Sequence, residues 1–342
     1  MLNLNYEPEV VVEDITALTY EEWKRYRTQG IGGSDAAAVC GISPWTTARD
    51  LYEEKVHKKI TEENDDGWVA KEIGRRLEEL VVQIFMKRTD TSPYAVRKMF
   101  RHPLFPFMIG NCDYFVMIDG KIFIIECKTS FGYQMNGWEG GNIPPHYVIQ
   151  GRHYMSVANV DGVIFLCLHG NNEDSLIIRR LERDLVQEEA LIKQEAYFWE
   201  TNVLSKRPPK YTEKADLVLK SIQGRYDVQE GKQIILPASY AENISDYLKL
   251  KEQKSALSLQ IKQIEEQMKL AYAPVQEAMA GAETAIIETG DRRYQAGYTR
   301  KVSTSIYKDS LEALQMMHPD IYKEYARTNV SHSFYIKEKK AG

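Results

Sequence analysis

Two charged side chains follow a run of bulky apolar residues in the stretch Ile122 to Lys128. The apolar run predicts a buried strand, and charges at its end need partners. Because side chains alternate across a strand, Glu126 and Lys128 share one face, while Cys127 points the other way and leaves its main-chain carbonyl available. The stretch therefore predicts a carboxylate and an ammonium held together on a rigid element.

A second carboxylate, that of Asp113, lies thirteen residues upstream of Glu126. The dipeptide Asp119-Gly120 between two apolar runs predicts a hairpin, whose pairing would bring Asp113 beside Glu126. Two carboxylates and a carbonyl are hard ligands that suit Mg²⁺, and a nearby lysine can orient a water or stabilise developing charge. The pattern predicts phosphodiester hydrolysis. The alternative is a plain Glu–Lys pair with an unrelated loop aspartate.

Two helical patterns offer further groups for this site. Glu78 lies beside the apolar stripe of a long predicted helix and could complete a metal site, or it could be an ordinary solvated glutamate. Gln150 and Tyr154 are four residues apart, so they share one helix face. Their amide and phenol could hold the nucleophilic water or the lysine, or the two could be polar residues at the edge of the core.

A glycine-rich turn near the N-terminus forms a separate constellation with Arg27 and Ser34. The turn, residues 30–33, allows close backbone approach, and a helix N-terminus after it offers free N–H groups. Arg27 would add a bidentate guanidinium, so the set predicts an anion pocket sized for a phosphate. The alternative is a turn followed by an N-cap.

Alternating helices and strands must position these groups. The hydrophobic spacing predicts a long helix around residues 69–84, strands at 108–118 and 121–129, a helix from Pro144-Pro145 to Ala158, strands at 162–168 and 176–181, and a helix from Leu185 to about Leu204. Helices flanking a central sheet define an α/β (α+β) fold.

The C-terminal third has a different character. The run Lys206 to Lys210 predicts the end of a core of residues 1–210, followed by a linker at 211–240. Residues 241–281 carry a heptad seam, which predicts a coiled-coil helical region with a kink at Pro274. It could pair as a hairpin within the chain or between subunits. Residues 282–342 form a basic segment, with ten Lys and Arg against five Asp and Glu after residue 291.

Composition sets the outer limits. The chain has 342 residues, a net charge of −5, 43% hydrophobic and 27% charged residues, which are ordinary values for a folded protein of about two domains. It has no apolar stretch of membrane-spanning length and no secretory pattern, so we expect a cytoplasmic location. Its four cysteines are far apart, which predicts buried free thiols and not a zinc site or disulfides.

Seven short motifs occur in the order found in one family. Together they span roughly Leu18 to Leu204. The chain thereby resembles the YqaJ-type viral recombinases, phage alkaline exonucleases related to lambda exonuclease within the PD-(D/E)XK nuclease superfamily. The motifs are Trp23-x3-Arg27, Ile31-Gly32-Gly33-Ser34-Asp35, Ser43-Pro44-Trp45, Gly74-x2-Leu77-Glu78, Gly110-Asn111-Cys112-Asp113, Glu126-Cys127-Lys128 and Gln150-x3-Tyr154.

This resemblance implies a restriction-endonuclease-like mixed sheet flanked by helices, and roles for individual residues. Mg²⁺, or alternatively Mn²⁺, would be held by Glu78, Asp113, Glu126 and the carbonyl of Cys127, and Lys128 would be the catalytic lysine. Gln150 and Tyr154 match the family's Gln-x3-Tyr helix.

The resemblance also implies a site for the 5′-phosphate of the resected strand. Arg27 and Ser34 would hold it, and Asn111 stands where lambda-like members have a serine that helps bind it; an amide can still donate. Trp45 could stack on the terminal bases or wedge between them, or be a buried structural tryptophan.

The implied function is 5′–3′ digestion of double-stranded DNA ends, leaving 3′ overhangs for a single-strand annealing protein. Ring trimers of lambda-like relatives suggest a homo-oligomer, and a phage or prophage origin is expected. The isolated cysteines argue against the iron–sulfur cluster of some superfamily members. The alternatives are a structure-specific or nicking endonuclease of the same fold, and a non-catalytic DNA-binding or scaffold protein.

Overall fold

The computed structural model describes residues 2–57, 68–130, 137–226, 228–290, 292–303 and 308–326. The chain divides into two compact units, Met1–Asp227 and Val228–Gly342. They are described separately below.

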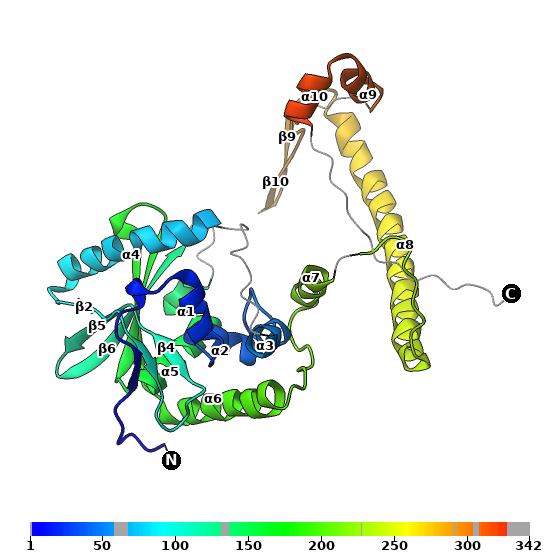
Figure 1. The fold of residues 1–342 in the computed structure, drawn as a ribbon. Coiled ribbons are helices and arrows are strands. Elements are labelled where there is room, and N and C mark those ends of the chain that lie inside the picture. The colour runs from blue at the N-terminus through cyan, green and yellow to red at the C-terminus, as the bar shows by residue number, and fades with distance from the viewer. Residues whose placement is uncertain are drawn as a thin grey trace. The chain divides into compact units, whose positions relative to one another are not determined.

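A five-stranded mixed sheet lies at the centre of the N-terminal unit (Figure 1), in the order β2-β5-β6-β7-β8. β6 and β7 are parallel and the other neighbours antiparallel. Because parallel neighbours need a crossover connection, helix α5 (Pro145–Ala158) joins β6 to β7. The strands are β2 (Tyr94–Ala95), β5 (Tyr114–Ile118), β6 (Lys121–Ser130), β7 (Gly162–His169) and β8 (Leu176–Glu182).

Helices cover both faces of this sheet, as the hydrophobic pattern predicts. Helix α4 (Trp68–Thr89) packs Val81 and Phe85 against Phe123 and Ile125 of β6. The residue between them, Ile124, lies in the opposite cluster with side chains of α5 and of α6 (Leu185–Tyr197). This alternation puts Glu126 and Lys128 on the α5 side.

The strand predicted over residues 108–118 is two strands in two different sheets. β4 (Ile109–Asn111) joins β1 (Glu9–Val12) and β3 (Met99–Arg101) in a three-stranded antiparallel sheet. β5 pairs instead with β6 in the larger sheet. The single-strand prediction is therefore wrong, because hydrophobic periodicity does not reveal that the pairing partner changes at Cys112 and Asp113.

The remaining α-helices of this unit precede or follow the strands of the five-stranded sheet in the sequence. Their bounds are α1 (Tyr20–Arg27), α2 (Gly33–Val39), α3 (Ala48–His57) and α7 (Ala215–Arg225). After α6, residues Phe198–Leu204 form a π-helical turn, which completes the helix predicted to Leu204.

The predicted core end at residue 210 is too early. The compact unit extends to Asp227 and includes α7, which lies in the predicted linker at 211–240. Ser221 of α7 donates to Asp50 of α3 at 2.7 Å, and Arg225 lies 3.7 Å from the same carboxylate. These polar contacts between elements far apart in the sequence leave no local signal.

The C-terminal unit contains a single long helix, α8 (Ala241–Ala278), which continues through Pro274. Of the two pairings left open for the heptad region, the hairpin within residues 241–281 is wrong, since α8 is one continuous helix. The predicted basic segment contains a two-stranded hairpin, β9 (Thr284–Thr289) with β10 (Arg292–Gly297), and two short helices, α9 (Lys308–Met317) and α10 (Pro319–Tyr325). Its residues 327–342 lie outside the described part of the chain.

None of the helices among the described residues has the length and apolar character required to cross a bilayer.

Candidate active site

The acidic pair lies where β5 begins and β6 leaves the core. Tyr114 pairs with Ile125, so the preceding residue, Asp113, comes opposite Glu126. Burial raises the pKa of Asp113 well above its usual value, and the negative charges of Glu126 and Glu78 raise it further, against the opposing effect of Lys128. The structure therefore brings the predicted carboxylates together in a buried place that favours a positive charge.

Glu126 is the centre of the polar contacts in this place. It is only 5% exposed, and its Oε1 accepts from Lys128 Nζ at 2.6 Å and from Gln150 Nε2 at 2.8 Å. Gln150 Nε2 also lies 3.3 Å from the hydroxyl of Tyr154. The other oxygen of Glu126, Oε2, is buried without a hydrogen-bond partner among the described residues. One carboxylate oxygen is thus fixed while the other lacks a partner.

Lys128 carries the positive charge of the site. Burial alone would lower the pKa of its amine, but Glu126 holds that pKa above the usual value. Lys128 Nζ also lies 4.7 Å from the centre of the Tyr147 ring, a distance suited to a cation–π contact. The ammonium is therefore held between an acid and an aromatic face.

Glu78 on α4 is half-buried, and its carboxylate interacts electrostatically with Glu126 and Lys128. Burial raises its pKa, and Glu126 raises it further. Cys127 is on the opposite face from Glu126, with its thiol 3.9 Å from the backbone carbonyl of Glu78.

The main chain of Cys127 is oriented toward the acids. A hydrogen bond from its backbone N–H lowers the pKa of Asp113. Because the N–H and C=O of one strand residue point to the same edge, the Cys127 carbonyl also faces the Asp113 side. A role of this carbonyl as a metal ligand stays a prediction.

The chemical types of the donor atoms suit a hard divalent cation. They are carboxylate and carbonyl oxygens, one of them the unpartnered Oε2 of Glu126. Among the described residues, however, no three acidic, histidine or cysteine side chains are close enough to hold an ion as they stand. Lys128 supplies the positive charge beside Glu126.

The predicted anion pocket brings Arg27 and Ser34 together. Arg27 Nη2 donates to Ser34 Oγ at 3.2 Å, and the guanidinium lies 5.7 Å from the Trp23 ring centre. The N-terminus of α2 is next to it, and a Cβ at Gly32 would come within 1.4 Å of Arg27 Nη1. Glycine at position 32 is therefore required for the guanidinium to lie against the turn.

Asp35 holds this guanidinium, and Lys55 in turn holds Asp35; neither role was predicted from the sequence. Asp35 Oδ1 accepts from Arg27 at 2.7 Å, and Asp35 Oδ2 accepts from the buried Lys55 amine at 2.9 Å. Burial alone would raise the pKa of Asp35, but Arg27 and Lys55 hold it well below its usual range. The signal for Lys55 was its spacing from Leu51, which places it on the buried face of α3.

Gly33 connects the pocket to the acidic cluster. A Cβ at Gly33 would come within 2.4 Å of the Tyr154 ring. Tyr154 contacts Gln150, which donates to Glu126. The anion pocket and the acids are therefore joined through consecutive turns of α5.

Trp45 is 65% exposed, so the interpretation that it is a buried structural tryptophan is wrong. Its ring packs edge-on against His146, 4.9 Å between centroids, and His146 neighbours Tyr147, which lies under Lys128. Burial, followed by the charge of Lys128, lowers the pKa of His146 to about 4. Trp45 thus presents an open aromatic surface at the margin of the site.

Asn111 lies on β4, two residues before Asp113. Its Nδ2 is buried without a hydrogen-bond partner among the described residues. The amide therefore has the free donor that a role in phosphate binding requires.

The prediction that all four cysteine thiols are buried is wrong for two of them. All four are free; Cys112 and Cys167 are buried, whereas Cys40 and Cys127 are half-buried.

Comparison with known proteins gives one relative over nearly the whole chain. The uncharacterized protein YqaJ of Bacillus subtilis (strain 168) is 31% identical over 324 residues, which are 94% of this chain and 95% of that protein. A family model described as the YqaJ-like viral recombinase domain matches residues 22–161.

Solved structures show more distant likeness. An alkaline exonuclease from Laribacter hongkongensis has 18% identity and a TM-score of 0.44, covering 60% of this chain and 98% of that one. A phage-related exonuclease from Haemophilus somnus 129PT has 13% identity and a TM-score of 0.37, covering 50% of this chain and 94% of that one.

The match to the relative extends over both units and, with the family model over the site, identifies the family: the chain belongs to the YqaJ-like viral recombinases.

Proposed function

We propose that this protein is a Mg²⁺-dependent nuclease that digests double-stranded DNA from its 5′ ends and leaves 3′ overhangs. The observation that carries the proposal is the buried cluster of Asp113, Glu126 and Lys128, in which Glu126 Oε2 lacks a partner. Membership of the YqaJ-like viral recombinases supports a nuclease role.

In this proposal Mg²⁺, or Mn²⁺ in its place, is held by Asp113, Glu126, the Cys127 carbonyl and Glu78. When bound, the ion supplies charge neutralisation at the scissile phosphate and lowers the pKa of a coordinated water. Lys128 stabilises charge that develops on the phosphate.

The helix α5 supplies the polar groups that orient this lysine and its acid. Gln150 fixes Glu126 Oε1, and the Tyr154 hydroxyl fixes Gln150 in turn. The Tyr147 ring supports the ammonium of Lys128 from the other direction.

The polarity of digestion is assigned to the anion pocket. Arg27 and Ser34, assisted by the free amide donor of Asn111, bind the 5′-phosphate of the strand being digested. Trp45 stacks on the terminal bases. Contacts of this kind read the backbone and the π-faces of bases, so digestion would be independent of sequence.

A single-strand annealing protein would receive the overhangs, and a phage or prophage origin with action in the host cytoplasm fits this role.

A digestion assay on the wild-type chain tests the proposal. The substrates are a linear duplex with 5′-phosphate, the same duplex with 5′-hydroxyl, and a closed circle, each with and without Mg²⁺. We expect Mg²⁺-dependent digestion of the linear duplexes, faster with 5′-phosphate, and an intact circle. Cleavage of the circle would indicate an endonuclease instead, and failure to cleave any substrate would favour a non-catalytic DNA-binding protein.

A further inference from the structure

The seam of α8 is a long apolar stripe that the described part of its own unit leaves uncovered. No residue of this helix is buried, and the exposed fractions are 65% for Leu250, 58% for Leu257, 55% for both Ile261 and Ile264, and 60% for Met268. The seam repeats at alternating three- and four-residue steps, which is the pattern of a coiled-coil interface. It consists of Tyr247, Leu250, Lys254, Leu257, Ile261, Ile264, Met268, Ala271, Val275 and Ala278.

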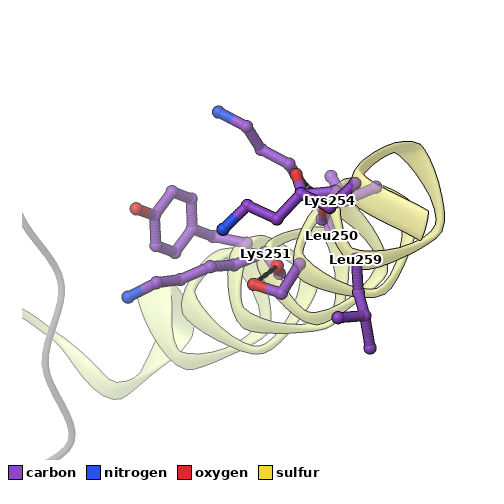
Figure 2. Close-up of a pocket in the computed structure, with 8 residues that line it drawn as sticks. Leu250, Lys251, Lys254 and Leu259 are labelled. Atoms are coloured by element: carbon purple, nitrogen blue, oxygen red, sulfur yellow. Dashed lines mark hydrogen bonds between the residues drawn. The ribbon is translucent and has the colours of Figure 1, made fainter. Parts of the chain in front are cut away.

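Figure 2 shows a pocket on the N-terminal half of α8, where Leu250 and Lys254 of the seam lie near Lys251 and Leu259. Lys254 is the single charged residue of the seam. A charge at a core position is costly unless its partner leaves room for the side chain to reach water, so Lys254 is the strongest constraint on what covers the helix.

We propose that α8 pairs with α8 of a second copy of this chain as an antiparallel coiled coil, symmetric about the point between Lys262 and Gln263. In this register each seam residue faces the residue of the other copy that lies equally far, in sequence, on the opposite side of this point. The layers are Tyr247 opposite Ala278, Leu250 opposite Val275, Lys254 opposite Ala271, Leu257 opposite Met268, and Ile261 opposite Ile264 of the other copy.

The sizes of the seam side chains favour antiparallel over parallel pairing of the two helices. The two longest polar-tipped residues of the seam, Tyr247 and Lys254, each face an alanine, so their stems can cover the small residue while the tips reach water. A parallel pair in register would instead place Lys254 against Lys254 and Ala271 against Ala271. That arrangement combines like-charge repulsion with an unfilled layer.

The residues that flank the seam are also compatible with this register. Gln260 lies beside Gln267 of the second copy, and side-chain amides can donate and accept between them. Ser258 lies beside Glu265, and Lys251 beside Tyr272, so no flanking pair of these joins like charges. The surface is therefore complementary to itself, as an isologous two-fold interface requires.

The association of the full-length chain in solution tests this inference. Sedimentation velocity over a concentration series should show a dimer for the wild type. Ile261→Glu should weaken the dimer about a hundredfold or more, because one apolar contact is lost in each of two symmetric layers. Lys262→Glu, which lies on the same helix outside the seam, should leave the dimer unchanged.

A double variant tests orientation and partner together. In the proposed register I261E/I264K places the new acid of each helix opposite the new base of the other, so it should recover dimer formation at least tenfold over I261E. The matched variant I261E/I264E should not recover it, because acids then face acids.

Circular dichroism of all variants reports whether they fold. A monomeric wild type at tens of micromolar, or dimers that form only with DNA or with an annealing protein, would overturn the proposal. Equal behaviour of I261E/I264K and I261E/I264E would also overturn it.

Discussion

The two units of this protein expose their hydrophobic residues in opposite ways. In the N-terminal unit, apolar side chains from α4, α5 and α6 close over both faces of the sheet, and the buried acid Glu126 lies against the amine of Lys128. In the C-terminal unit, α8 presents a full heptad stripe with none of its residues buried. The first arrangement fixes side chains in place for chemistry, whereas the second leaves a surface to be matched by another molecule. We therefore expect substitution of a single buried side chain in the N-terminal unit to change activity, whereas a single substitution on the surface of α8 should not.

The strongest test of this contrast compares one lysine from each unit. Lys128→Ala should reduce the digestion rate by about a hundred- to a thousand-fold, because it removes the group assigned to developing negative charge. Lys262→Ala on α8 should leave the rate within twofold. Single-turnover digestion measures the rate, and gel mobility shift should show that both variants still bind duplex ends. Unchanged digestion by Lys128→Ala would reject the site.

A smaller effect is expected at the anion pocket. Arg27→Ala should reduce digestion of 5′-phosphorylated ends about tenfold or more, down to the rate on 5′-hydroxyl ends, through loss of charge-assisted hydrogen bonds. The exposed neighbour Arg25 provides the control as Arg25→Ala. The measurement is the ratio of rates on the two kinds of end, and an equal loss on both would contradict a phosphate role.

Packing between the pocket and α5 can be tested through one added methyl group. Gly33→Ala should lower the free energy of unfolding by about 1–3 kcal/mol, because the new Cβ would overlap the Tyr154 ring. Gly224→Ala in α7, where a Cβ meets nothing within 4 Å, should instead stabilise by about 0.5–1 kcal/mol. Denaturant unfolding compares the two. A neutral Gly33→Ala would mean that Tyr154 can move away freely.

The smallest expected effect concerns pH. His153 is buried between Glu195, at 2.8 Å, and the carbonyl of Ile109, at 2.9 Å. Burial alone would lower the pKa of this histidine, but Glu195 and the Ile109 carbonyl raise it above its usual value. The stabilisation is thus complete below the unfolded-state pKa of about 6.5 and is lost as pH rises through the folded-state value.

His153→Gln should remove this part of the pH dependence. Unfolding free energies measured from pH 5.5 to 9 should fall with pH in the wild type and fall less in the variant. Parallel curves would show that His153 does not titrate in this range.

Local patterns predicted the elements of the N-terminal unit well, because each buried face repeats with the period of its helix or strand. The neighbourhood of Glu126, Lys128, Gln150 and Asp113 followed from strand alternation and helix spacing. Their assignment as ligands and catalytic groups stays a prediction. The roles of Asp35 and Lys55 were not predicted, because the ion pairs of Asp35 with Arg27 and with Lys55 depend on how three short helices pack.

The sequence predicted less well which element packs or pairs against another. The stretch 108–118 reads as one strand, yet its two halves join different sheets. In α8 the heptad spacing predicted a helix with an apolar seam, but the same spacing serves a hairpin or an intermolecular pair. Periodicity describes the face of an element and leaves open what lies against it.

The change of sheet between β4 and β5 has a consequence for the acids. Asp113 belongs to the short passage from the three-stranded to the five-stranded sheet, while Glu126 is rooted in the larger sheet alone. The distance between the carboxylate oxygens of Asp113 and Glu126 therefore depends on how the three-stranded sheet packs against the five-stranded sheet. A substitution buried under β1 or β3 would therefore change the distance between the two carboxylates on which the proposed metal site depends.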